Sequence, residues 1–442
     1  MDEVTRAAAA APAMASWSGA YRRDLLYASA DALAAAADEV VSIAAVETGH
    51  AETLLRGEMD RTTGQLRLFG DFVAGGRHRT EMVSPGAAAD GADVVNVPVP
   101  VGPVAVFAAS NLPLAFGVAG GDTASALAAG CPVVVKAHPA QPETSRRIAD
   151  LLAATLPDGA FGMVEGGAET SLALVRHPAI RAVGFTGSLA GGRALMDAAA
   201  ARTHPIPVYA EMGSLNPMFV LPAAAADQGW ADTIAGSVTR ACGQLCTKPG
   251  LVVLPDTDAG RALADTLAAA VAASATYRML TPAMAEAHQQ WLTRAGRLGD
   301  VTAGTAEPPP FAVRVTPAAL RGELLDEHFG PAVVLCLAPE AAYPDIVSRL
   351  SGSLTATVVA TTADAAVAAG LLPSLTALAG RVVWNAVPTG VAVCDAMQHG
   401  GPWPATSAAW STSVGTAALQ RFLRPVALQG VPADLAATVS PR

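Results

Sequence analysis

The sequence predicts an α/β fold with a doubly wound parallel sheet, and two alternating patterns support this class. Short, uniformly apolar runs that suit buried strands occur at residues 104–107, 133–135 and 182–185. Stretches of helical character lie between and after them, at residues 123–129, 142–154 and 190–201. Strands that are apolar on both faces are typical of parallel sheets covered by helices on both sides.

The other elements follow in chain order from the same patterns. Residues 16–68 repeat apolar side chains at helical spacing with few breakers, which predicts helices packed outside a sheet. The pattern then predicts strands at 208–211 and 218–221, a helix at 230–241, and further strands at 251–254, 333–335 and 357–360. The proline-rich stretch 302–310 predicts a loop, and the alternating tail 421–432 predicts a strand able to pair with a neighbouring subunit.

The length of 442 residues is enough for two or three domains with a large core. We expect residues 1–211 to form the first domain, with an oligomerisation hairpin near residues 81–101. Residues 212–410 would form the second domain. Residues 411–442 would be a C-terminal return and oligomerisation segment, so that the chain assembles as a homodimer or homotetramer.

The composition argues against several classes of function. The formal net charge is -10 and Lys and Arg do not cluster, so no nucleic-acid partner is expected. The uncharged stretch 94–121 contains four prolines and does not suit a membrane helix, so no membrane partner is expected. The first residues lack a basic region followed by an apolar stretch, which favours a cytoplasmic location.

The five cysteines are scattered and odd in number, which predicts reduced thiols and no disulfide framework. Cys242 and Cys246 lie four residues apart, but no second Cys pair or nearby His accompanies them. That spacing makes a weak zinc candidate, and we expect no metal site.

Cys246, Glu211 and Asn111 are the candidates for chemistry. A thiolate at Cys246 can attack a carbonyl carbon, the Asn111 amide and the Cys246 backbone N–H can stabilise the oxyanion, and Glu211 can activate water against the resulting thioester. Each residue also has a purely structural interpretation. Asn111 could be a turn residue, Glu211 a strand end, and Cys246 a small buried apolar side chain. The three together favour the functional interpretation.

The chain resembles the aldehyde dehydrogenase superfamily over nearly its whole length, through six motifs in the order found in that family. The motifs are Ser110-Asn111-Leu112-Pro113, Val135-Lys136-Ala137-His138-Pro139, Phe185-Thr186-Gly187-Ser188, Glu211-Met212-Gly213, Gly243-Gln244-Leu245-Cys246 and Glu327-His328-Phe329-Gly330-Pro331. The segments 61–67, 120–132 and 399–406 are similar to the branch of 2,5-dioxovalerate (α-ketoglutarate semialdehyde) dehydrogenases and bacterial long-chain aldehyde dehydrogenases.

The resemblance implies a cofactor-binding first domain, a catalytic second domain and oxidation of an aldehyde to a carboxylic acid with NAD(P)⁺. The implied substrate is 2,5-dioxovalerate or another short oxo acid. The alternatives are a long-chain aldehyde, an acylating reaction with coenzyme A, which Glu211 disfavours, and a noncatalytic binding protein or scaffold of the same fold.

The resemblance also implies the residues that bind the cofactor. Lys136 would meet the adenosine ribose, and Glu327 would accept hydrogen bonds from the nicotinamide ribose, with Phe329 packed nearby. The pyrophosphate would lie at a helix start, where N–H groups and the helix dipole favour an anion. The residues expected at this start are Gly187, Ser188 and Gly192. Lys136 could instead be a solvated strand end, and Gly187-Ser188 an ordinary helix cap.

Two features of the sequence bear on the choice of cofactor and substrate. Pro139 stands where many NAD-preferring relatives carry an acid, and Lys136 and His138 are close by, so NADP is favoured over NAD. His138 could equally be a capped loop histidine. Leu245 replaces an expected aromatic residue, and Lys248 replaces a neutral one. The ammonium of Lys248 could favour the thiolate and attract a carboxylated substrate, or it could point to solvent.

Overall fold

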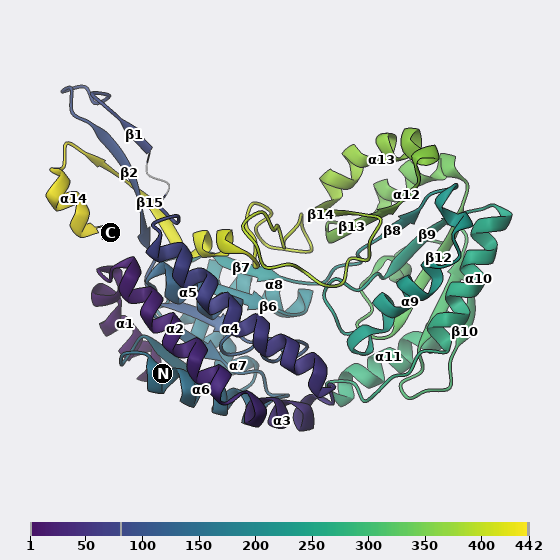
Figure 1. Ribbon diagram of the computed structural model, residues 1–442, viewed down its shortest axis with the longest axis horizontal. Helices are drawn as coiled ribbons and strands as arrows, with labels where there is room; N and C mark the ends of the chain where they lie inside the picture. The colour runs from purple at the N-terminus through teal and green to yellow at the C-terminus, as the bar shows by residue number, and fades with distance from the viewer. Residues whose placement is uncertain (1, 80–81, 440–442) are drawn as a thin grey trace. The chain divides into compact units, whose positions relative to one another are not determined.

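A computed structural model describes residues 2–79 and 82–439 (Figure 1). The chain divides into two compact units, which are treated separately below. Unit 1 comprises residues 1–210, 393–397 and 411–442, and unit 2 comprises residues 211–392 and 398–410. Among the described residues, no helix combines the length and apolar character needed to cross a membrane.

Unit 1 is built on a five-stranded sheet in the order β5-β4-β3-β6-β7. The pairs β5–β4, β4–β3 and β3–β6 are parallel. The strands are β3 (Val104–Phe107), β4 (Val133–Lys136), β5 (Phe161–Val164), β6 (Ala182–Thr186) and β7 (Val208–Glu211).

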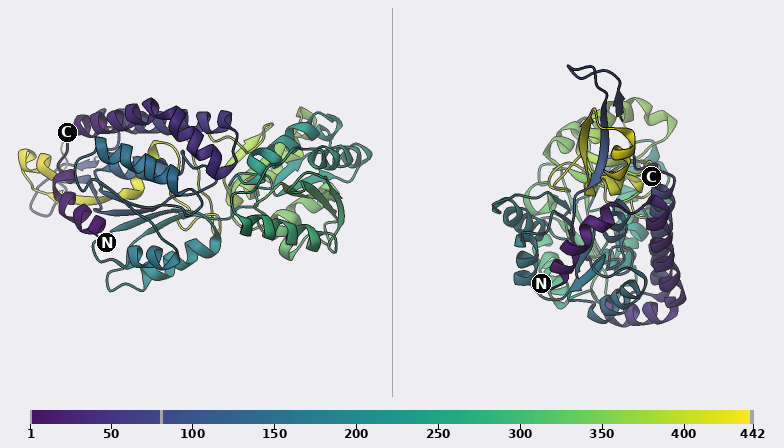
Figure 2. Two further views of the ribbon diagram at one scale, coloured as in Figure 1. Left: turned by 90° about the horizontal axis from the view of Figure 1, so that it is seen from below. Right: turned by 90° about the vertical axis from the view of Figure 1, so that its left-hand side faces the viewer.

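Helices cover both faces of this sheet (Figure 2). Val104, Val106, Val133 and Val135 pack against one group of helices, and the alternate residues of the same strands pack against another. The first group is α2 (Gly19–Ala35), α3 (Ala37–Thr48), α4 (Glu52–Ala74), α5 (Gly121–Ala129) and α6 (Pro142–Thr155). The second group is α1 (Asp2–Ala15), α7 (Ala168–Arg176) and α8 (Leu189–Ala200). This two-sided burial explains why the strand sequences are apolar at every position.

A separate antiparallel sheet in unit 1 joins segments from opposite ends of the sequence. It contains β1 (Met82–Ser84), β2 (Val94–Pro100) and β15 (Leu423–Gln429), with β2 in the middle. Residue 81, the first of the expected hairpin, lies outside the described residues. The helical segments η6 (Thr416–Phe422) and α14 (Ala433–Val439) flank β15.

Unit 2 contains a seven-stranded sheet in the order β10-β11-β12-β9-β8-β13-β14, parallel except for β10. Its strands are β8 (Met218–Val220), β9 (Leu251–Pro255), β10 (Asp300–Ala303), β11 (Phe311–Val315), β12 (Ala332–Ala338), β13 (Ser353–Val359) and β14 (Ala379–Trp384). One core lies against α11 (Pro282–Ala295), α12 (Tyr343–Arg349) and α13 (Ala365–Leu378), and the other against α9 (Trp230–Thr239) and α10 (Asp258–Ala272). Short 3-10 helices occur at η1 (Ala224–Ala226), η2 (Arg240–Gly243), η3 (Gly322–Leu325), η4 (Glu340–Ala342) and η5 (Thr362–Asp364).

Candidate active site

Cys246 lies just after a tight turn that follows α9. Three successive residues of this turn, Ala241, Cys242 and Gly243, have positive φ angles of 51°, 55° and 67°. A Cβ atom at Gly243 would lie 2.2 Å from the Gly330 backbone, so only glycine fits there. The turn packs directly on the segment that leads into β12, which gives the thiol a fixed position.

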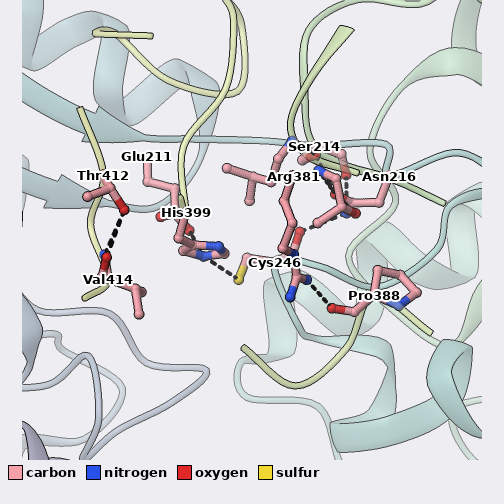
Figure 3. Close-up of polar contacts among 11 residues, drawn as sticks. Glu211, Ser214, Asn216, Cys246, Arg381, Pro388, His399, Thr412 and Val414 are labelled. Atoms are coloured by element: carbon pink, nitrogen blue, oxygen red, sulfur yellow. Dashed lines mark hydrogen bonds and ion pairs between the residues drawn. The ribbon is translucent and has the colours of Figure 1, made fainter. Parts of the chain in front are cut away.

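Asn216 anchors the backbone that carries the thiol (Figure 3). Its Nδ2 donates to the carbonyl oxygens of Cys246 and Lys248 at 2.8 and 3.0 Å. Its Oδ1 accepts from the Thr355 N–H at 3.2 Å, which ties the same loop to β13. Because Asn216 is fully buried, these bonds hold the Cys246 loop against the sheet edge.

The segment 399–406 brings His399 to the same place. A Cβ at Gly401 would lie 2.2 Å from the Ser353 oxygen, so this glycine allows close contact with the sheet. The Met212 N–H donates to the Ala405 oxygen at 2.8 Å, and Glu211 bridges Thr406. The backbone pairing therefore places the end of β7 beside this segment.

Cys246, His399 and Glu211 converge in unit 2 (Figure 3). His399 Nε2 lies 3.6 Å from the Cys246 Sγ and 3.1 Å from the Glu211 Oε1. His399 and Glu211 are buried, whereas the thiol is partly exposed. An imidazole in this position can take the thiol proton, and the carboxylate can stabilise the resulting imidazolium.

Arg381, on β14, supplies a positive charge close to this cluster. Its guanidinium donates to the Pro388 oxygen and interacts electrostatically with Cys246. Burial lowers the pKa of Arg381, and the Cys246 thiolate opposes that shift. Arginine stays protonated at neutral pH, so the group can stabilise a thiolate or bind an anionic substrate.

Lys248 is not the solvent-exposed lysine that one interpretation of the sequence suggests. It is 3% exposed, and its Nζ donates to the Ala332 oxygen at 2.8 Å. Burial lowers its pKa to about 8, and the Glu327 carboxylate opposes the shift. The ammonium therefore ties the Cys246 loop to β12.

Glu327 and Phe329 lie in the segment before β12, and both are partly buried. Burial raises the pKa of Glu327 to about 7, while a hydrogen bond from the Ser214 backbone and the charge of Lys248 oppose the shift. A Cβ at Gly213 would approach the Glu327 Oε2 to 2.9 Å, so the carboxyl group lies beside the backbone that follows Glu211. Both residues thus belong to the same unit as Cys246.

Lys136, His138 and Pro139 lie at the end of β4 in unit 1. Lys136 is 8% exposed, so it is not a solvated strand end, and burial lowers its pKa. The pKa of His138 falls to about 4 through burial and then the charge of Lys136. His138 Nδ1 accepts from the Ala140 N–H at 3.2 Å, as a loop histidine would. A neutral His138 leaves Lys136 as the cation of this trio.

The segment Gly187-Ser188 opens α8, as the sequence predicts. Ser188 is its N-cap, and its side chain accepts from the Gly191 N–H at 3.2 Å. Gly192 is buried within the first turn, whereas Gly187 and Ser188 are exposed. The capping role is therefore present, and the exposed helix start remains accessible to an anion.

Asn111 belongs to unit 1 and follows β3. It is 9% exposed, and its backbone oxygen lies 3.1 Å from His50 Nε2. Glu58 on α4 accepts from the Leu114 and Ala115 N–H groups at 3.1 and 3.3 Å, which fixes the loop that follows. The role of Asn111 as an oxyanion donor stays a prediction.

Two residues of the site, His399 and Arg381, have no role in the sequence-based prediction. His399 is 153 residues from Cys246 in the chain, and Arg381 is a single cation within an apolar strand. The available signals were weak: a histidine before two glycines, and an arginine beside a strand glycine. Neither pattern indicates a catalytic partner without the fold.

Comparison with known proteins gives consistent matches. The sequence pattern of the "Aldehyde dehydrogenase family" matches residues 2–288. "Alpha-ketoglutaric semialdehyde dehydrogenase 2" of Azospirillum brasilense is 44% identical, over 94% of this chain and 85% of its own length. "Alpha-ketoglutaric semialdehyde dehydrogenase" of Acinetobacter baylyi is 40% identical, over 88% and 78%. The NAD-dependent aldehyde dehydrogenase from Sinorhizobium meliloti has a TM-score of 0.82 and 24% identity, covering 98% of this chain and 88% of that one.

Proposed function

Because this chain belongs to the aldehyde dehydrogenase family, we propose that it oxidises a short oxo acid semialdehyde, with α-ketoglutaric semialdehyde as the first candidate. The predicted family, α/β fold and NAD(P)-dependent oxidation of an aldehyde are confirmed. The names of the two curated relatives support this substrate. The observation that carries the chemistry is the convergence of Cys246, His399 and Glu211.

The first step uses the thiol and its two neighbours. His399 takes the proton from Cys246, and Glu211 stabilises the imidazolium at 3.1 Å. The thiolate sulfur then bonds to the aldehyde carbon, and the carbonyl electron pair moves to oxygen. We assign the stabilisation of that oxyanion to the Cys246 N–H and the Asn111 amide.

The second step oxidises and releases the acyl group. Bound NAD(P)⁺ supplies the hydride acceptor. Loss of the hydride leaves a thioester on Cys246. Glu211 then accepts a proton from water as the water oxygen attacks the thioester, and the C–S bond breaks to give the acid and the free thiolate.

Residues of both units fit a nicotinamide cofactor. In unit 1, Lys136 and the start of α8, at Gly187, Ser188 and Gly192, suit the ribose and the pyrophosphate. In unit 2, the Glu327 carboxyl group is an acceptor for ribose hydroxyls, and Phe329 adds apolar surface nearby. We assign these binding roles from the type of each side chain.

We also propose that NADP⁺ is preferred over NAD⁺, and the Pro139→Glu variant tests this preference. Lys136 is the cation that would favour a 2′-phosphate, and exposed Pro139 offers no opposing charge. A carboxylate at this position would repel the phosphate. Pro139→Glu should therefore weaken the binding of NADP⁺ roughly tenfold more than the binding of NAD⁺. Steady-state constants for both cofactors measure the change, and Pro139→Gln is the matched neutral control. A wild type that strongly prefers NAD⁺, or an equal effect of Gln, would contradict the proposal.

The substrate carboxylate is assigned to Arg381. An oxo acid carries an anion on the same short chain as its aldehyde, so a cation near the nucleophile can orient it. Both cations donate to carbonyl oxygens, Arg381 to Pro388 and Gly390 and Lys248 to Ala332. Arg381 is only partly buried and interacts electrostatically with Cys246, whereas Lys248 is 3% exposed. Arginine also suits a carboxylate because it can donate two parallel hydrogen bonds.

Replacement of Arg381 by methionine tests both the substrate and this role. The kcat/KM for α-ketoglutaric semialdehyde should fall about 10- to 150-fold, the range for a hydrogen bond to a charged group, with a smaller loss for pentanal. Arg381→Lys, which keeps the charge, should recover part of the loss. Equal losses for both aldehydes would remove Arg381 from substrate recognition. Better turnover of decanal than of the oxo acid by wild type would favour the long-chain alternative.

We further propose self-association, as a homodimer or homotetramer, through the sheet formed by β1, β2 and β15. Met82 and Val83 of β1 are 66% and 55% exposed, which is typical of apolar residues that a second subunit covers.

The described cysteines are free thiols, in keeping with the cytoplasmic location proposed from the sequence.

A further inference from the structure

The cluster of Cys246, His399 and Glu211 joins three types of metal ligand in one place. One ligand atom from each residue lies within 4.8 Å of the other two (Figure 3). A thiolate, an imidazole and a carboxylate are the side-chain ligands that Zn²⁺ takes in proteins. We propose that this chain binds Zn²⁺ through these three residues, and that the bound metal is a reversible inhibitor.

The distances suit a tetrahedral ion. Zinc bonds of usual length would separate sulfur from nitrogen by about 3.6 Å and nitrogen from oxygen by about 3.4 Å. The observed separations are 3.6 Å between the Cys246 Sγ and His399 Nε2, and 3.1 Å between that nitrogen and the Glu211 Oε1. The Cys246 Sγ and a Glu211 carboxylate oxygen also lie within 4.8 Å of each other, so side-chain rotation can bring all three ligand atoms to zinc-bonding distance.

The charge and burial of the ligands also favour the ion. The thiolate and the carboxylate together carry two negative charges, which Zn²⁺ neutralises in a site where His399 and Glu211 are 1% and 4% exposed. The nearby Arg381 guanidinium opposes a dication, so the affinity should be lower than that of a structural zinc site. The partly exposed Cys246 provides access for the ion, and the fourth position stays open for water.

Inhibition follows because the bound metal occupies the sulfur lone pair that the reaction needs. A lone pair of the Cys246 sulfur that is bonded to Zn²⁺ is not available to attack an aldehyde carbon, and the coordinated Glu211 cannot accept a proton from water. This inhibitory part rests on the proposed function of Cys246 and Glu211. The binding part rests on the ligand geometry alone.

Titration of the metal-free full-length chain with Co²⁺ and Zn²⁺ tests the two parts separately. Co²⁺ should produce one thiolate-to-metal charge-transfer band per chain in the near ultraviolet, and Zn²⁺ should displace it. Cys246→Ser should abolish the band, and His399→Gln or Glu211→Gln should weaken Co²⁺ binding roughly tenfold or more. The control Cys242→Ser should keep the band, because the Cys242 Sγ donates to the Tyr277 oxygen at 3.2 Å. Thermal unfolding of each variant checks that it is folded.

Initial rates with and without Zn²⁺ complete the test. Stoichiometric Zn²⁺ should lower aldehyde oxidation by wild type, and EDTA should restore it to at least the starting rate. Unchanged Co²⁺ affinity in folded His399→Gln and Glu211→Gln would overturn the three-ligand site, as would an active wild type that gives no band. A chain that gives the predicted band but oxidises no aldehyde would retain the metal site and refute the proposed function.

Discussion

The Cys246→Ala substitution should lower the rate of aldehyde oxidation on the order of 10⁴-fold or more, because no other group of the cluster can form the thioester. The loss should fall on turnover and not on cofactor binding, since the residues assigned to the adenosine and pyrophosphate lie in unit 1. Steady-state turnover and the quenching of protein fluorescence by NADP⁺ measure the two properties separately.

Cys242→Ala is the matched control for this prediction. Cys242 lies four residues earlier in the same loop and is fully buried, and burial raises the pKa of its thiol. Its loss should change turnover by less than about threefold, because a buried neutral thiol is unreactive. A Cys246→Ala enzyme that keeps most of its turnover would refute the covalent mechanism, whatever Cys242→Ala does.

The sequence predicts the main strands well because they are buried on both faces. The apolar runs at 104–107 and 208–211 coincide with β3 and β7. The strands β5 and β14, which contain Gly162 and Gly380, were not predicted, and neither were β10 and β11. The loop predicted at 302–310 was wrong at its start, because residues 302 and 303 belong to β10. The structure explains both glycines: a Cβ at Gly162 would lie 2.4 Å from the Glu3 side chain of α1, and one at Gly380 would lie 2.1 Å from the Gly400 oxygen. A neighbouring side chain at Gly162 and a neighbouring backbone at Gly380 thus occupy the space of a side chain at these positions.

The site was only partly predictable, for a related reason. Cys246 and Glu211 lie in short motifs that local sequence reveals. His399 reaches them through the packing of Gly400 and Gly401 against the sheet edge, which no local pattern encodes.

The charge states of the site residues were also beyond the sequence. Sequence alone predicts an ammonium at Lys248 without its surroundings, and it leaves the charge of His138 open. Burial lowers the pKa of His138 to about 4, and Lys248 is enclosed with its ammonium bonded to a carbonyl oxygen. The two pKa values depend on the packing around the groups, so they become known only with the fold.

Glu211→Gln should leave a burst of NAD(P)H and slow the steady state by roughly 100-fold or more, because an amide cannot accept a proton from water. The burst reports the chemistry up to the thioester, in which His399 takes the thiol proton. The steady state then reports hydrolysis of that thioester. Rapid mixing of enzyme, cofactor and aldehyde resolves the two phases.

The contrast with His399→Gln assigns the proton transfers. Glu211 and Cys246 both contact His399 Nε2, so the carboxylate could act only by stabilising the imidazolium. In that case Glu211→Gln and His399→Gln would both slow the burst, and their steady-state rates would fall in parallel. If Glu211 is the deacylation base, its variant keeps the amplitude of the burst near one equivalent, whereas His399→Gln slows the burst itself. Equal loss of the burst and the steady state in Glu211→Gln would therefore assign the carboxylate to thiol activation and leave the hydrolytic base to another group.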